Sequence, residues 1–168
     1  DLLRQQSSAR AIQRYRELLP EQIPALAKRL NLAYPRLERE WAMGARTLVH
    51  GDAHIGNMFF LPDGRSGLLD WQVLGFEQGM RDITYFMINS LPTELRLKHQ
   101  YDLMQRYVQA LNEKGVLFSL EKARQQYLLH APYVWISAAV TAASDTMQDK
   151  KIAGAGLIRA SRAMVDLD

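Results

Sequence analysis

Cysteine is absent from the 168-residue sequence, which excludes disulfide bonds, thiolate metal sites and cysteine nucleophiles and fits a reducing compartment. Long apolar runs are also missing. The longest nearly apolar stretch, residues 131–143, is too short and too polar to span a bilayer. Arg4, Gln5 and Gln6 interrupt any signal-peptide core near the start. We therefore expect a soluble cytoplasmic protein without a membrane partner.

An excess of charge of one sign is lacking too. The 21 basic and 18 acidic residues give a formal net charge of only +3, and lysine and arginine form no cluster of five or more. A nucleic-acid partner is therefore not expected. A hydrophobic content of 48% and a charged content of 23% are ordinary for a globular protein, so disorder is not indicated either.

Hydrophobic periodicity predicts a mainly helical fold with a small β-hairpin, an α+β class, in a single domain of residues 1–168. Residues 1–45 show the spacing of two amphipathic helices. Ser8 is predicted to cap the first helix and Pro20 to end it, and Pro35 is predicted to break the second.

Residues 46–79 change to the two-residue period of strands. Strands are expected at residues 47–49, 58–61 and 66–70, and a turn between the last two joins them into a hairpin. Residues 80–168 return to helical spacing. The expected helices there are one that starts after Pro92 and ends at Gly115, one that is capped by Ser119 and kinked at Pro132, and one over about 150–165.

Two short motifs lie in the strand-rich segment. Residues 50–57 read HGDAHIGN, and residues 68–71 read LLDW. Carboxylate and amide oxygens at loop ends are what phosphoryl transfer requires, because it depends on a positioned hydroxyl and on a divalent cation at the phosphates. We expect Asp52 to orient an acceptor hydroxyl and take its proton. Asn57 and Asp70 are expected to bind Mg²⁺, which prefers oxygen ligands.

The two motifs resemble those of the aminoglycoside phosphotransferase and choline kinase family, small-molecule kinases with a protein-kinase-like fold. The resemblance covers residues 50 to about 86. It implies transfer of the γ-phosphoryl group of ATP to a hydroxyl of a small acceptor, with Asp52 as the catalytic base. Asn57 and Asp70 would then be the ligands of the Mg²⁺ that accompanies ATP. The helical block 80–168 would lie on the substrate side.

The histidines of the first motif are counted with its catalytic residues. His50 matches the loop histidine of the family and is expected mainly to brace the backbone of the loop. His54 either faces the phosphates or the acceptor, or packs. The resemblance also implies that Asp82, at a helix start, hydrogen-bonds the catalytic loop from below. The Asp-Pro pair that often precedes this aspartate in the family is not present here.

A glycine-rich turn and a strand lysine, which grip the nucleotide in such kinases, have no counterpart ahead of the motif. The first glycine is Gly44, and Lys28, on a helical segment, is the one lysine before His50. The chain is therefore expected to be the C-terminal lobe alone, with the N-terminal lobe as a missing partner. We expect such a fragment to turn over little or no substrate.

The acceptor is left open by the sequence. Tyr133 and Trp135 could form an aromatic wall, and Asp145 and Asp149 could meet a cationic acceptor, or all four could be ordinary core and helix-end residues. Two other functions are weighed. Asp52-Ala53-His54 also resembles the start of a dinuclear metallophosphoesterase pattern, but the further ligand motifs of that family are missing. A pseudokinase-like binding module is the other alternative.

Overall fold

The computed structural model describes residues 2–168, so Asp1, the first residue of the predicted helical segment 1–45, lies outside the described residues. The α-helices are α1 (Leu2–Arg14), α2 (Ile23–Trp41), α3 (Met80–Ser90), α4 (Thr93–Glu113), α5 (Leu120–Ala143) and α6 (Lys150–Asp166). Two short 3-10 helices are η1 (Arg16–Leu18) and η2 (Ile55–Asn57). The strands are β1 (Thr47–Val49), β2 (Met58–Phe60), β3 (Ser66–Leu68) and β4 (Gly75–Glu77). This confirms the predicted mainly helical α+β fold.

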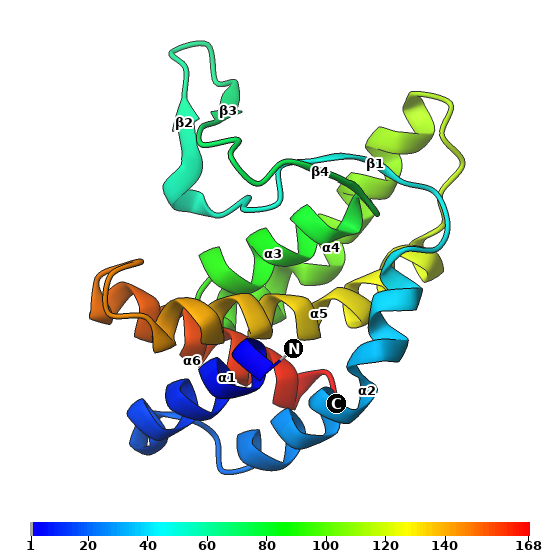
Figure 1. Cartoon of the computed structure of the whole chain (residues 1–168). Coiled ribbons are helices and arrows are strands. Elements are labelled where there is room, and N and C mark those ends of the chain that lie inside the picture. Colours follow the sequence, from blue (N-terminus) through cyan, green and yellow to red (C-terminus); the bar gives the residue numbers. More distant parts are fainter. Residues whose placement is uncertain (1) are drawn as a thin grey trace.

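Helix α5 runs through the middle of the helical body and packs against each of the other five α-helices (Figure 1). Its predicted apolar face is confirmed, with Ala123, Tyr127, Ala131, Trp135, Ala138 and Ala142 all buried. The many alanines allow neighbouring helices to approach closely. The indole Nε1–H of Trp135 donates to the Ser161 hydroxyl at 3.0 Å, which satisfies the polar atom of the largest fully buried side chain.

Several predicted helix boundaries are wrong. Ser8 does not cap a helix, because α1 begins at Leu2 and Ser8 is buried inside it. Pro20 follows η1 rather than α1, which already ends at Arg14. Pro35 does not break α2: the helix continues to Trp41, with Pro35 on its exposed face. The buried side chains of α2 hold the helix together despite the hydrogen bond that proline cannot donate.

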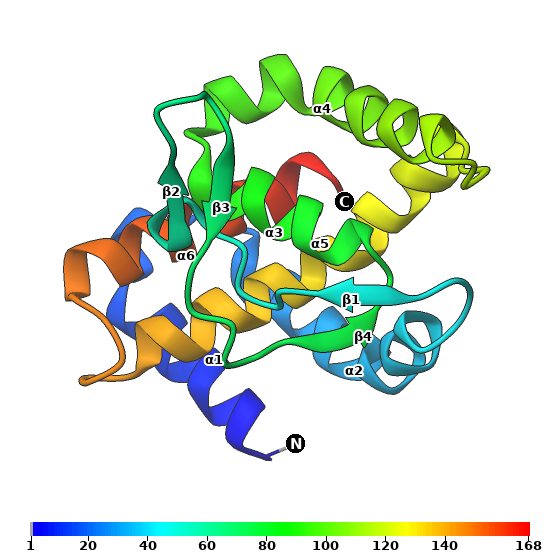
Figure 2. The ribbon, with the colours of Figure 1, turned by 90° about the horizontal axis from the view of Figure 1, so that it is seen from above.

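The strands form two separate antiparallel pairs. The predicted hairpin is confirmed as β2 and β3, with Met58 opposite Leu68. Strand β4 was not predicted; it pairs with β1, with Val49 opposite Gly75. Figure 2 shows the strands in front of the helices, and Figure 1 shows them along one side of the helical body, above α3.

Within residues 2–168 the helices are all too short or too polar to be candidates for crossing a membrane.

Candidate active site

The strand pairing forces two loops to lie side by side. Residues 50–57 connect β1 to β2, and residues 69–74 connect β3 to β4. Because β1 pairs with β4 and β2 pairs with β3, the two loops start and finish next to each other. A backbone hydrogen bond joins them at one end, where Leu69 N donates to Asn57 O at 2.7 Å. The two sequence motifs are therefore brought together by the fold.

Gly51 marks a second contact between the loops. Its φ of +85° lies in the left-handed region, and a Cβ at this position would lie 2.3 Å from the carbonyl oxygen of Val73. Only glycine avoids both the backbone strain and this collision. The turn that precedes Asp52 thus depends on glycine because the second loop passes directly against it.

Asp52 and Asn57 contact each other directly. Asn57 Nδ2 donates to the backbone oxygen of Asp52 at 3.0 Å and to its carboxylate Oδ2 at 3.2 Å. The amide nitrogen is thereby committed to Asp52, which leaves Asn57 Oδ1 as the atom that can accept a cation. Both side chains are only half-buried, so they are within reach of a ligand.

Asp70 follows the end of β3 with an unusual backbone. Its φ of +62° makes it the one residue other than glycine with a positive φ in the described part of the chain. Such a conformation costs free energy and, where it occurs, frequently marks a functional site. The carboxylate is exposed, and its contact with Gln72 Nε2 is long, at 3.4 Å.

His54 lies between the two aspartates. Its Nδ1 accepts from Gly56 N at 3.0 Å, so Nε2 is the ring nitrogen that faces Asp52 Oδ2, at 3.6 Å. Hydrogen bonding to Asp52 raises the pKa of His54 despite partial burial, and the negative charges of Asp52 and Asp70 act in the same direction. The structure therefore places His54 beside the carboxylate, not in the core.

Asp52 is held ionised by its neighbours. Partial burial acts to raise the pKa of Asp52, but hydrogen bonding from His54, Tyr85 and Asn57 outweighs burial and holds the pKa below its usual value. Tyr85 comes from α3, where it is buried and its hydroxyl lies 3.1 Å from the hydroxyl of Ser137 on α5. An ionised carboxylate only accepts hydrogen bonds, so it is ready to accept one from a hydroxyl.

His50 braces both loops from inside. The side chain is 1% exposed, its Nε2–H donates to Leu69 O at 2.6 Å, and its Nδ1 accepts from Asp52 N at 3.2 Å. Its ring also packs on Trp71, with centroids 4.7 Å apart. These contacts are those expected of a residue that supports the backbone; a chemical role for His50 stays a prediction.

Asp82 supports the same loop from below, in the contact that the resemblance implied. From the first turn of α3 its carboxylate accepts hydrogen bonds from His50 N at 2.6 Å and from Gly51 N at 2.9 Å. Sequence reasoning missed two further residues of α3 that reach the loop, Tyr85 and Ser90. Nothing local distinguishes a tyrosine or a serine on a helix as a loop contact, so only the fold reveals them.

The donor set fits Mg²⁺. Among residues 2–168 no group of three or more histidine, aspartate and glutamate side chains forms a protein cage for a metal. Magnesium does not require one, because it keeps several waters and is commonly held by one or two carboxylates together with substrate phosphates. The exposed Asp70 carboxylate and the uncommitted Asn57 Oδ1 are ligands of this kind.

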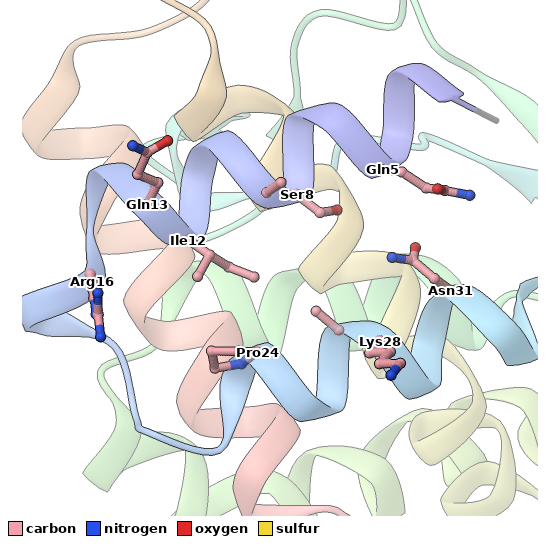
Figure 3. A pocket seen from close by; sticks show the side chains of 10 residues that line it. Gln5, Ser8, Ile12, Gln13, Arg16, Pro24, Lys28 and Asn31 are labelled. Carbon is pink, nitrogen blue, oxygen red and sulfur yellow. The ribbon is translucent and has the colours of Figure 1, made fainter.

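Two hollows of the surface lie away from these loops. A groove of about 530 Å³ runs between α1 and α2, with Ile12, Pro24 and Lys28 among its lining residues (Figure 3). A second, of about 670 Å³, lies along α4.

The side chains considered for acceptor binding have structural contacts. Trp135 belongs to the core. The Arg81 guanidinium lies over the ring of Tyr133, 3.8 Å from its centroid. Asp145 pairs with Arg14 at 2.6 Å and also with Arg10, and Asp149 caps α6 by accepting from Lys151 N. These contacts fit the core and helix-end alternative.

Comparisons with known proteins identify the family of the chain. No curated protein and no solved structure matches it. Residues 3–118, more than two thirds of the sequence, match the model of the ecdysteroid kinase-like family. The matched range contains both loops and α3, so the match and the site geometry concern the same part of the molecule. The family lies in the protein-kinase-like superfamily that includes choline kinases. The chain therefore belongs to the ecdysteroid kinase-like family of phosphotransferases.

Proposed function

We propose that the chain is the catalytic lobe of a small-molecule kinase that transfers the γ-phosphoryl group of ATP to a hydroxyl of a small acceptor. The observation that carries this proposal is the convergence of Asp52, Asn57 and Asp70 on two loops that touch each other. Membership of the family supports the reaction class. The narrower assignments, to ATP, to Mg²⁺ and to the roles of single residues, belong to the proposal.

Asp52 binds and orients the acceptor hydroxyl. Because the pKa of Asp52 is held low, the carboxylate is ionised at neutral pH and accepts the hydrogen bond of the hydroxyl. In a loose phosphoryl-transfer transition state the attacking oxygen carries little new bonding, so its proton can pass to Asp52 late in the reaction. His54 and Asn57 keep the carboxylate in one orientation, since both face its Oδ2.

Asn57 and Asp70 would hold the cation that accompanies the phosphates. The Asn57 amide is oriented by its two hydrogen bonds to Asp52, and the left-handed backbone of Asp70 sets the direction in which its carboxylate leaves β3. When bound, Mg²⁺ neutralises negative charge on the phosphates and aligns them for in-line transfer.

The nucleotide-gripping lobe is proposed to come from outside these 168 residues. In support, the strands and the loops between them expose several large apolar side chains that a further domain could cover. Those on or next to β1, β2 and β4 are Leu48, Phe59, Phe60, Val73, Leu74 and Phe76. A further domain packed on this layer would cover them and close the open site. The chain alone would then turn over little or no substrate.

The acceptor class follows from the family name alone. The matched family is named for kinases of ecdysteroids, so a steroid carrying several hydroxyl groups is the first acceptor to test.

The test uses the protein extended upstream of Asp1, supplied with Mg²⁺, ATP and an acceptor. An ecdysteroid, choline and an aminoglycoside are compared. We expect a phosphate monoester of one acceptor, formed in equal amount to ADP and dependent on Mg²⁺. Hydrolysis of phosphate esters with Mn²⁺ and without nucleotide would instead favour a phosphoesterase. Partner binding that is indifferent to nucleotide, without any transfer, would favour a binding module.

A further inference from the structure

Helix α3 accepts hydrogen bonds from backbone amides of the loop 50–57 at two places. Near the helix start, Asp82 accepts from the amides of His50 and Gly51. At the last residue of the helix, the Ser90 hydroxyl accepts from Ile55 N at 2.9 Å. Eight residues separate the two anchors, which corresponds to about 12 Å along an α-helix. The helix thus fixes the distance between the beginning of the loop and the turn that carries Asn57.

The turn η2 has little else to tie it to the helices. Its residue Ile55 is 55% exposed, and Gly56 is exposed and has no side chain to pack. In the described structure the other hydrogen bonds of the turn stay within the two loops and the start of β2: Gly56 N donates to His54 Nδ1, Asn57 N to His54 O, Asn57 Nδ2 to Asp52, Met58 N to Ile55 O, and Leu69 N to Asn57 O. The bond to Ser90 is therefore the one hydrogen bond in the described structure that links η2 to a helix.

Ser90 is itself held firmly. It is only 7% exposed, although it is the final residue of α3. The carbonyl of its neighbour Asn89 accepts from Arg159 Nη1 of α6 at 2.8 Å, which ties the end of α3 to a second helix. A hydroxyl fixed in this way can set the position of an exposed turn.

We propose that Ser90 is a positioning residue for Asn57. Its hydrogen bond with the amide of Ile55 holds η2 where the Asn57 side chain contacts Asp52 and would bind the cation. The catalytic meaning of this role rests on the proposed function. The structural part, that Ser90 anchors η2, does not. Replacing the hydroxyl by hydrogen removes the acceptor for Ile55 N–H and leaves the turn without a hydrogen bond to a helix in the described structure.

The first experiment measures amide hydrogen exchange at Ile55 in the 168-residue chain. Ser90→Ala is expected to speed exchange at Ile55 by about fivefold or more, the equivalent of losing one ordinary hydrogen bond. Ser161→Ala is the matched control, because Ser161 is also a buried serine whose hydroxyl accepts one N–H, that of Trp135. It should leave Ile55 exchange unchanged. Ser90→Thr keeps the hydroxyl and should restore slow exchange.

The second experiment titrates Mg²⁺ into the chain and follows the Asn57 side-chain amide by NMR. Ser90→Ala should weaken the Mg²⁺ effect at Asn57 by about tenfold, in the range for residues that support metal ligands, and Ser161→Ala should not. Unchanged Ile55 exchange in Ser90→Ala, or an equal change in Ser161→Ala, would overturn the proposal. A different outcome separates the two parts of the proposal. If Mg²⁺ leaves the Asn57 amide of the wild-type chain unaffected, while amide exchange at Ile55 still depends on Ser90, the metal role of Asn57 is contradicted and the anchor is confirmed.

Discussion

The contact between Gly51 and Val73 is the tightest constraint on the candidate site. Both loops keep their course only because residue 51 has no Cβ and accepts a positive φ. Gly64, in the hairpin turn, has nearly the same backbone, with a φ of +83°, but open space around its missing Cβ. Substituting alanine at each of the two positions distinguishes the cost of the backbone conformation from the cost of the collision with Val73.

Gly51→Ala should therefore destabilise the protein much more than Gly64→Ala. The left-handed backbone costs about 1–2 kcal/mol for alanine at either position. At position 51 the collision adds backbone movement, for which we expect roughly another 1–3 kcal/mol. Free energies of unfolding from urea titrations of the two variants measure the difference. Equal losses would show that Val73 can move away at no cost.

Single residues could be predicted from sequence where the signal is local. Asp52, Asn57 and Asp70 stand in two short motifs whose spacing is visible along the chain, and the fold places the two loops that carry these motifs next to each other, while the roles of the three residues stay a prediction. Ser90 could not be predicted, because its partner Ile55 lies 35 positions away and serine is common at helix ends. A long-range hydrogen bond leaves no periodic pattern in a single sequence.

At the scale of elements, Gln78 and His130 connect several segments in the interior. Gln78 Nε2 donates to Glu40 O and Met43 O, and its Oε1 accepts from His130 Nε2 of α5 at 3.0 Å. The end of α2, the residue that follows β4, and helix α5 are thus joined at one point. Within residues 2–168 the other ring nitrogen, Nδ1, is buried without a hydrogen-bond partner. The ring stacks on Trp41.

The protein should lose stability in acid because His130 is buried. Burial, with the nearby positive charge of Arg81, lowers the pKa of His130 to about 3. Below a pH of about 6.5, His130 binds a proton in the unfolded chain but not in the folded chain. The free energy of unfolding therefore falls as the pH falls towards 3. The expected loss is about 1.4 kcal/mol per pH unit well below 6.5.

Urea unfolding of His130→Gln between pH 7 and pH 5 measures the contribution of His130 to the pH dependence of stability. The variant should lose part of the pH dependence of the wild-type protein, whatever its stability at pH 7. The same slope in both proteins would show that His130 is protonated equally in the folded and unfolded states.

Elements were predictable according to the length of their pattern. Helices α4 and α5 were expected close to their observed starts because they repeat the apolar spacing over several turns and have clear end signals, such as the Ser119 cap, whereas α6 was expected over about residues 150–165 from a weaker pattern. Strand β4 has three residues, and Gly75 is one of them, so alternation cannot reveal it. The predicted break at Pro35 is wrong because the packing of α2 outweighs the low helix propensity of proline.

At the scale of the whole molecule, a helical body supports a thin layer of strands and loops that contains the candidate site (Figure 1). Helix α3 lies directly under that layer, and α5 holds α3 in place. The mainly helical class could be predicted from composition and periodicity. The way in which two strand pairs align the two loops could not, because it depends on the undetected β4.

The turnover of Asp52→Asn in the protein extended upstream of Asp1, with Mg²⁺ and ATP, tests the central claim most directly. Asparagine preserves the shape but cannot take the proton of the acceptor, so we expect turnover to fall by at least ~10² while the unfolding midpoint stays close to wild type. Asp63→Asn, which alters an exposed carboxylate paired with Arg65 in the hairpin turn, is the control and should retain full turnover. Unchanged turnover in Asp52→Asn would contradict the assignment of Asp52 as the base.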